Sequence, residues 1–170
     1  SHYLESIAKV LSVKSKILNE DRTIWVQVPE NYNPNSSLRY PVVYVLDGDV
    51  RMSTLATVYE NYWGHFLPKM ILVGISNGEN RVRDLTPTVI TQRNGGAMNM
   101  ETGGAEKFTK FIEHEIIPFI DKQYKTTSYR TLIGHSFAGL FVGKVLLDHP
   151  HIFRNYVAID PSLDWDNQYL

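Results

Sequence analysis

Short runs of apolar residues alternate with helical patterns along this chain, and that alternation limits the folds open to it. The apolar runs cover residues 41–46, 70–75, 131–133 and 156–159. Helical spacing of apolar residues is found between or after them, at 52–62, 105–124 and 136–149. Continuous apolar strands suit a sheet buried on both faces, and intervening helices suit parallel pairing. The sequence therefore predicts an α/β fold with a mostly parallel sheet.

The N-terminal part follows a different pattern. Residues 8–18 and 22–28 alternate polar and apolar side chains, with a turn signal at 19–21 between them. This predicts an antiparallel hairpin at the N-terminus. Pro118 is expected to kink or divide the helix over 105–124. Residues 77–104 have no clear period, and loops of that length are usually functional or mobile.

Composition limits the classes of partner. The chain has 170 residues, which fits one domain. Its 17 basic and 18 acidic residues give a formal charge of -1, which argues against a nucleic-acid clamp or a polybasic membrane binder. The chain has no cysteine, so disulfides, thiolate zinc sites and cysteine nucleophiles are excluded. Oligomeric state and compartment, cytoplasm or bacterial periplasm, stay open.

The sharpest local signal surrounds Ser136. The run Gly-His-Ser-Phe-Ala-Gly at 134–139 follows a short apolar strand and leads directly into a helix. This context is typical of a nucleophile elbow, in which small residues let strand and helix approach and the serine stands above the sheet edge. Ala138 replaces the glycine usual in the motif. The alternative is that Ser136 is only an N-cap among packing residues.

A second candidate follows the first buried strand, at Asp47, Gly48 and Asp49. In α/β-hydrolases the loop after this strand supplies one of the two N–H groups that bind the oxyanion. Gly48 would let the backbone approach a ligand closely. The alternative is an ordinary loop with a capping aspartate.

Taken together, several segments resemble one family. They are 103–121, 132–140 and 158–163, with further matches at 45–48 and 81–87. The combination resembles the putative-esterase branch of the α/β-hydrolases, which holds siderophore trilactone esterases, esterase D and feruloyl esterases. The resemblance covers roughly residues 15–167, and the iron-siderophore subgroup is nearest. It implies an α/β-hydrolase fold and a serine hydrolase with a Ser-His-acid triad and no metal cofactor.

The resemblance also implies roles for particular residues. Ser136 would be the nucleophile, and the backbone N–H of Phe137 with one from Gly48–Asp49 would form the oxyanion hole. Arg81 or Arg83 would line the substrate side, where a guanidinium can hold carboxylate or phenolate oxygens.

The two arginines have an alternative role in structural ion pairs with Asp84 or Glu79, and we expect one of them to be structural. The chain also departs from the family pattern at Asp164, where an aromatic residue is expected before Trp165. That departure puts a substrate-facing stacking surface in doubt.

A general base is missing from the expected place. Triad order in this fold is Ser, acid, His, and only 34 residues follow Ser136. His149 and His151 lie at the far end of the helix, about 20 Å away, and His135 is expected to be buried under the elbow. Asp160 is expected at the cleft edge as a capping residue.

We therefore expect residues 1–170 to form a single α/β-hydrolase domain that is incomplete at its C-terminus, lacking further strands and helices. The catalytic His and acid would then lie outside this chain, and the chain alone would be inactive. The last strand and the helices beside it would expose apolar surface.

The predicted function is that of a serine carboxylic-ester hydrolase acting through an acyl-enzyme on a small-molecule ester, either siderophore-type or aromatic. The alternative is a non-catalytic ligand-binding or interaction domain on a hydrolase scaffold. A nucleotide site is disfavoured because Gly139–Lys144 is one residue short of a P-loop. A metal site at Asp47, Asp49 and His65 lacks a ligand-spacing motif.

Overall fold

A computed structural model describes residues 2–62 and 66–170. The strands are β1 (Lys9–Ser15), β2 (Glu20–Gln27), β3 (Tyr40–Val45), β4 (Ile71–Ile75), β5 (Gln92–Arg93), β6 (Gly96–Ala97), β7 (Thr126–His135) and β8 (Asn155–Ile159). The α-helices are α1 (His2–Ile7), α2 (Gly48–Tyr62), α3 (Arg81–Leu85), α4 (Ala105–Phe111), α5 (Ile117–Gln123) and α6 (Phe137–Asp148). A 3₁₀ turn covers Gly78–Asn80, and a π-helical segment covers Ile112–Ile116. None of the helices described is long and apolar enough to cross a bilayer.

Six strands form one sheet in the order β1-β2-β4-β3-β7-β8, and β5 and β6 form a separate small hairpin. β2 pairs antiparallel with both β1 and β4. The remaining pairs, β4 with β3, β3 with β7 and β7 with β8, are parallel. The predicted N-terminal hairpin and mostly parallel sheet are confirmed.

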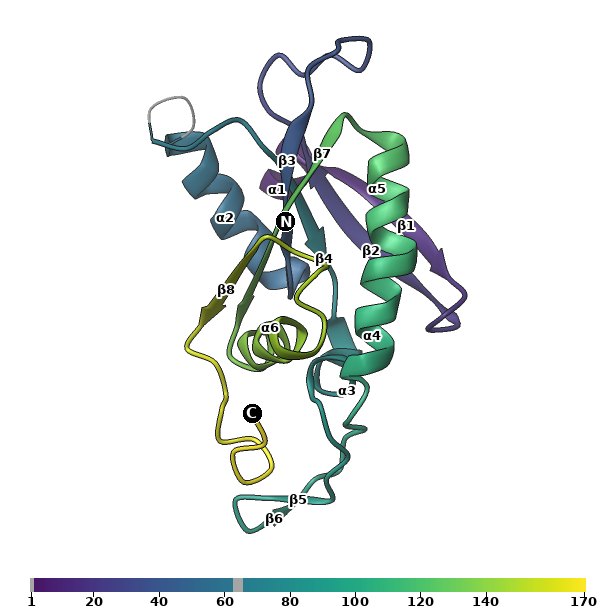
Figure 1. Cartoon of the computed structure of the whole chain (residues 1–170), viewed down its shortest axis with the longest axis vertical. Helices are drawn as coiled ribbons and strands as arrows, with labels where there is room; N and C mark the ends of the chain where they lie inside the picture. The colour runs from purple at the N-terminus through teal and green to yellow at the C-terminus, as the bar shows by residue number, and fades with distance from the viewer. Residues whose placement is uncertain (1, 63–65) are drawn as a thin grey trace.

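Two apolar cores cover the two faces of the sheet. Val42 and Tyr44 of β3 pack in the larger core, which takes in the buried side chains of α4, α5 and α6. Val43 and Val45 pack in the smaller core beneath α2, with Met52. Because successive strand side chains point to opposite faces, a strand buried on both sides must be apolar throughout. Figure 1 shows α2 on one side of the sheet and the α4–α5 column on the other.

The interruption expected at Pro118 takes the form of a π-helical segment that divides α4 from α5. The helix runs on from α4 through the π-helical segment Ile112–Ile116 into α5, with Pro118 in the first turn of α5. Proline has no N–H to donate and crowds the preceding turn. A π-helical turn immediately before Pro118 widens the helix at that point, so the column in Figure 1 stays continuous.

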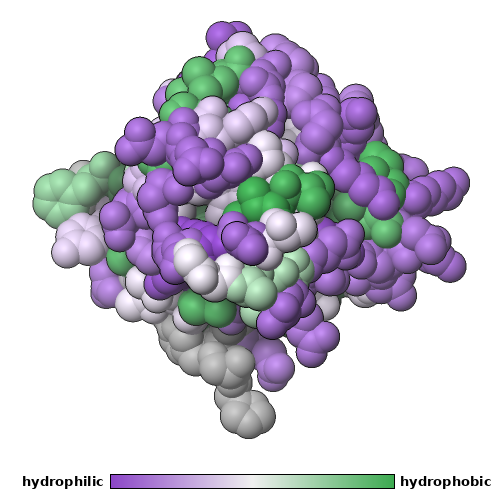
Figure 2. Space-filling view, turned by 90° about the horizontal axis from the view of Figure 1, so that it is seen from below, coloured by the Kyte–Doolittle hydropathy of each residue, from purple (hydrophilic) through white to green (hydrophobic). Residues whose placement is uncertain are grey.

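Two other segments differ from expectation. Helix α2 begins at Gly48, so Gly48 and Asp49 lie in its first turn instead of in a loop. The aperiodic segment 77–104 holds α3 and the β5–β6 hairpin. Figure 1 shows this hairpin beside the C-terminal residues at the lower end, and Figure 2 shows that end as polar surface broken by separate apolar patches.

β8 lies at one edge of the sheet, and β1 lies at the other. The β8 side chains Val157 and Ile159 are 39% and 46% exposed, and Leu146 and Leu147 of the neighbouring α6 are exposed as well. The expectation of exposed apolar surface at the β8 edge is confirmed.

Candidate active site

Ser136 stands in a strained backbone conformation between β7 and α6. Its φ is 61° and its ψ is -120°. A non-glycine residue with positive φ is uncommon, and such strain gathers at functional sites. The Ser136 N–H donates to the Ile159 carbonyl at 3.0 Å, and its carbonyl accepts from the N–H groups of Leu140 and Ser162 at 3.0 and 3.2 Å. These bonds hold the strained turn in place.

The side chain of Ser136 makes no capping hydrogen bond to α6. The alternative reading as a simple side-chain N-cap is therefore wrong. Its Oγ instead lies 3.2 Å from Ser162 Oγ. The predicted strand–turn–helix arrangement is present, with a hydroxyl that is free of the helix backbone.

Small residues bring the strand and helix together. A Cβ added to Gly134 would lie 2.3 Å from the carbonyl oxygen of Ala138 and 2.5 Å from its carbonyl carbon. One added to Gly139 would lie 3.0 Å from Pro161 Cα. Ala138 itself is fully buried, so the fold accommodates the extra methyl group that distinguishes it from the usual glycine.

The first N–H groups of α6 are open. In the described part of the chain, no acceptor pairs with the N–H of Phe137 or Ala138, whereas Leu140 bonds back to Ser136. Free N–H groups in the first turn are a property of every helix, and together with the helix dipole they attract negative charge. The Phe137 N–H is therefore a free hydrogen-bond donor, as an oxyanion site requires.

Asp47 also has a left-handed conformation, with φ 52°, and is buried. Its N–H donates to Asn77 Oδ1 at 3.0 Å, and its carbonyl accepts from Val50 and Arg51 at 2.9 and 2.8 Å. Burial raises the pKa of Asp47, although the hydrogen bond from Arg81 acts in the opposite direction. The turn between β3 and α2 is thus held through both the backbone and the carboxylate of Asp47.

Gly48 follows directly and packs against β4. An added Cβ would lie 2.7 Å from Gly74 C and from Ile75 N, so only glycine fits. In residues 2–62 and 66–170, no acceptor pairs with the N–H of Gly48 or Asp49. This N-terminus of α2 is the second set of free donors that the sequence singled out.

Arg81 connects the Asp47 loop with the elbow. Its Nε lies 2.9 and 3.0 Å from the two carboxylate oxygens of Asp47, and its Nη2 donates to the His135 carbonyl at 3.4 Å. The guanidinium carbon lies 5.4 Å from the centre of the Phe137 ring. About a third of the side chain is exposed.

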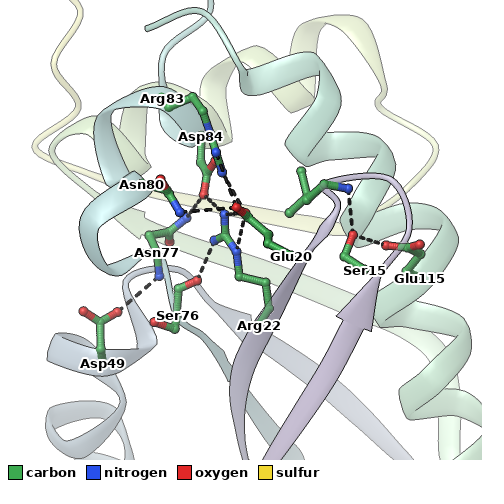
Figure 3. Close-up of polar contacts among 11 residues, drawn as sticks. Ser15, Glu20, Arg22, Asp49, Ser76, Asn77, Asn80, Arg83, Asp84 and Glu115 are labelled. Atoms are coloured by element: carbon green, nitrogen blue, oxygen red, sulfur yellow. Dashed lines mark hydrogen bonds and ion pairs between the residues drawn. The ribbon is translucent and has the colours of Figure 1, made fainter. Parts of the chain in front are cut away.

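Arg83 lies elsewhere, in a buried ion cluster (Figure 3). Its Nη2 is 2.7 Å from Asp84 Oδ1 and 2.8 Å from Glu20 Oε1, and Arg22 pairs with the same two carboxylates. Burial alone would raise the pKa of Glu20, but hydrogen bonds from Arg83 and Arg22 outweigh it and lower that pKa. Arg83 thus makes the ion pair with Asp84 that the alternative, structural role requires.

Within the described chain, no histidine ring is bonded to Ser136. His149 and His151 pair with Glu106 and Glu113 at 3.0 and 2.9 Å, so both belong to the helix surface as predicted. His65 lies outside the described residues.

The prediction for His135 was wrong in part. Its ring is half-exposed instead of buried under the elbow, with Nδ1 3.0 Å from Arg51 Nη2. His135 lines an apolar pocket of about 180 Å³ between α2 and the strand ends. Because this pocket opens to solvent, the residue stays partly exposed.

Sequence reasoning missed Arg93, which lies on β5. Its guanidinium carbon is 4.9 Å from the centre of the Phe137 ring and 5.4 Å from that of Trp165, and its Nη2 donates to Asp164 at 2.8 Å. Trp165 is fully buried, and its Nε1 donates to Thr88 Oγ1 at 2.9 Å. Trp165 therefore packs behind Phe137 instead of presenting a stacking surface. No local signal links residues so far apart in sequence.

Asp160 follows β8, is exposed and has φ 44°. It lies at the strand end where the cleft edge was expected. No group of three or more His, Cys, Asp or Glu side chains that could hold a metal ion occurs in the part of the chain described.

A match to a family model identifies the family of this chain. The model of the family described as "Putative esterase" matches residues 15–167. This chain belongs to that family. It is 33% identical over 167 residues to the ferri-bacillibactin esterase BesA of Bacillus subtilis, covering 89% of this chain and 58% of BesA. It is 29% identical over 150 residues to the apo-salmochelin esterase of Escherichia coli, covering 82% of this chain and 46% of that protein.

Solved structures agree with the family fold. The IroE-like serine hydrolase from Shewanella oneidensis is 38% identical, with a TM-score of 0.85 over 92% of this chain and 51% of that one. The BES protein from Bacillus cereus is 31% identical, with a TM-score of 0.80 over 95% of this chain and 66% of that one. The α/β-hydrolase fold expected from the sequence is confirmed. The chain spans about half to three fifths of the length of the curated relatives named above.

Proposed function

We propose that this chain carries the nucleophile and the oxyanion hole of a serine esterase that hydrolyses siderophore-type carboxylic esters. The proposal rests on the conformation of Ser136 at the turn from β7 into α6. Its φ is 61°, and its hydroxyl makes no capping hydrogen bond to the helix. Similar proteins are named ferri-bacillibactin esterase, apo-salmochelin esterase and, in Aspergillus fumigatus, siderophore triacetylfusarinine C esterase.

The proposed reaction has two steps. Ser136 Oγ attacks the ester carbonyl carbon, its proton passes to a base, and the C–O bond to the leaving alcohol breaks as that proton is handed on. Water then cleaves the acyl-enzyme and frees the acid and Ser136. In both steps the tetrahedral oxyanion accepts hydrogen bonds from the Phe137 N–H and from an N–H of Gly48 or Asp49.

Among the histidines whose side chains the structure describes, His135, His149 and His151 are paired with Arg51, Glu106 and Glu113, and none is bonded to Ser136. We place both the base and the acid that orients it outside the described residues. The chain spans 58% of BesA, and we propose that the complete activity also requires residues outside those described here.

Arg81 is proposed to face the substrate. Its Nε is committed to Asp47, which fixes the guanidinium beside the Phe137 ring and leaves part of it exposed. A fixed guanidinium can donate two parallel hydrogen bonds to carboxylate or catecholate oxygens. This would favour esters with an anionic acyl group.

The test is hydrolysis of a catecholate trilactone and of p-nitrophenyl acetate by the protein at its natural length. Ser136→Ala is expected to abolish turnover of both, whereas Ser128→Ala, which alters an exposed serine on the same strand, retains it. Absence of turnover, together with trilactone binding that is equal in the parent protein and Ser136→Ala, would favour the non-catalytic binding alternative. Turnover that survives in Ser136→Ala would contradict the proposed nucleophile.

A further inference from the structure

The loop that would supply the second oxyanion donor is tied to a buried side chain from another strand. Asn77 follows β4 and is only 2% exposed. Its Oδ1 accepts the Asp47 N–H at 3.0 Å, and its own N–H donates to Asp49 Oδ1 at 3.3 Å. Side chain to backbone bonds therefore run in both directions between the two loops. Figure 3 shows Asp49 and Asn77 joined in this way.

The side-chain nitrogen of Asn77 bonds to the ion cluster that contains Arg22, Arg83 and Asp84. Nδ2 donates to Asp84 Oδ2 at 3.4 Å, and Asp84 is in turn held by Arg22 at 2.6 Å and Arg83 at 2.7 Å. Arg22 also donates to the carbonyl of Ser76, the residue before Asn77. The position thus needs an acceptor on one side and a donor on the other, which an amide provides and a carboxylate does not.

The hydrogen bond between Asn77 and the Asp47 N–H helps to hold Asp47 in its strained backbone conformation. A non-glycine residue at φ 52° is strained and persists only where its surroundings fix it. Asn77 supplies the acceptor for that residue's N–H, and Gly48 and Asp49 follow directly in the chain. If Asp47 relaxes, the two N–H groups after it turn with the backbone.

We propose that Asn77 is a positioning residue for the oxyanion hole, acting through Asp47 on the N–H groups of Gly48 and Asp49. This inference rests on the proposed esterase function. Oxyanion contacts strengthen in the transition state, so their loss lowers kcat more than it changes KM. Removing one oxyanion donor outright costs about 10²–10³ in kcat, and a donor that is only misaligned should cost about tenfold to a hundredfold.

The experiment measures kcat and KM on p-nitrophenyl acetate at natural length, per active site titrated with a fluorophosphonate. Asn77→Ala is expected to lower kcat about tenfold to a hundredfold with KM within about twofold, and to weaken binding of an aryl boronic acid, a tetrahedral mimic, by a similar factor. Asn77→Leu keeps roughly the side-chain volume but removes both the acceptor for the Asp47 N–H and the donor to Asp84, and it should lower kcat in the same way should Asn77→Ala not fold. Asn80→Ala, in the adjoining turn and without a bond to the Asp47 loop, serves as the control with unchanged kcat.

The outcomes separate the two claims. If the parent protein turns over the ester and the variant that folds has the parent's kcat per titrated site, the inference about Asn77 is overturned and the esterase stands. A melting temperature that falls while kcat stays unchanged likewise overturns it, because that is a purely structural role. If the parent protein shows no turnover at all, the proposed function fails and this inference falls with it.

Discussion

Replacing Gly134 with alanine would place a methyl group where the backbone of Ala138 already lies. The added Cβ would come within 2.3 Å of a carbonyl oxygen and 2.5 Å of a carbonyl carbon. Overpacking usually costs about 1–3 kcal/mol, and backbone atoms cannot swing aside as a side-chain tip can, so we expect a loss of about 3 kcal/mol. For a chain of this size, that loss corresponds to a fall in melting temperature of about 6–12 °C.

The assay combines thermal unfolding with the rate of fluorophosphonate labelling at Ser136. Gly134→Ala should lower both, because the same clash that costs stability moves the elbow. Gly143→Ala is the matched control within α6, where an added Cβ meets only the tip of Leu170 at 3.3 Å. There alanine's helix propensity, worth about 1 kcal/mol over glycine, should leave the melting temperature equal or higher. A Gly134→Ala protein with the parent's melting temperature and labelling rate would refute the close approach of β7 and α6.

Further predictions concern the ion pairs. Arg22→Met leaves the buried Asp84 carboxylate with a single arginine, and we expect about 3 kcal/mol less stability in urea unfolding; a loss under about 1 kcal/mol would contradict this. The lowered pKa of Glu20 means that its stabilising contribution is present above its ordinary pKa of 4.5 and is lost as pH falls through the lower folded-state value. Glu20→Gln should therefore flatten part of the fall in unfolding free energy as pH drops from 4.5 to the lower folded-state pKa, and an unchanged pH profile would count against it. Arg81→Gln should lower kcat/KM for a catecholate ester about tenfold more than for p-nitrophenyl acetate, as expected for a charged hydrogen bond; equal losses would restrict Arg81 to supporting Asp47.

The strands of the parallel sheet could be predicted because burial on both faces leaves an unbroken apolar run. β7 was predicted only over 131–133, yet it begins at Thr126. Its first half is polar and partly exposed, and it is extended by pairing with β3 across an irregular register after Tyr40. Pairing of that kind depends on a neighbouring strand and leaves no apolar pattern in the sequence.

The elbow was predictable for a related reason. Gly134 and Gly139, whose types are fixed by close approach of neighbouring atoms, lie within a few residues of Ser136, so the whole motif can be read from one short segment. Most of the support around the elbow was not predictable. Arg81 was a candidate from the sequence, but Asn77, after β4, and Arg93, on β5, reach Asp47 and Phe137 only through the folded topology.

The central claim is that Ser136 is the nucleophile, and covalent labelling tests it most directly. The protein at its natural length would be treated with a fluorophosphonate, digested, and mapped by mass spectrometry. We expect one modified peptide, with the label on Ser136, and no label in Ser136→Ala. A label on another residue, or turnover of esters by a protein in which Ser136 stays unlabelled, would contradict it.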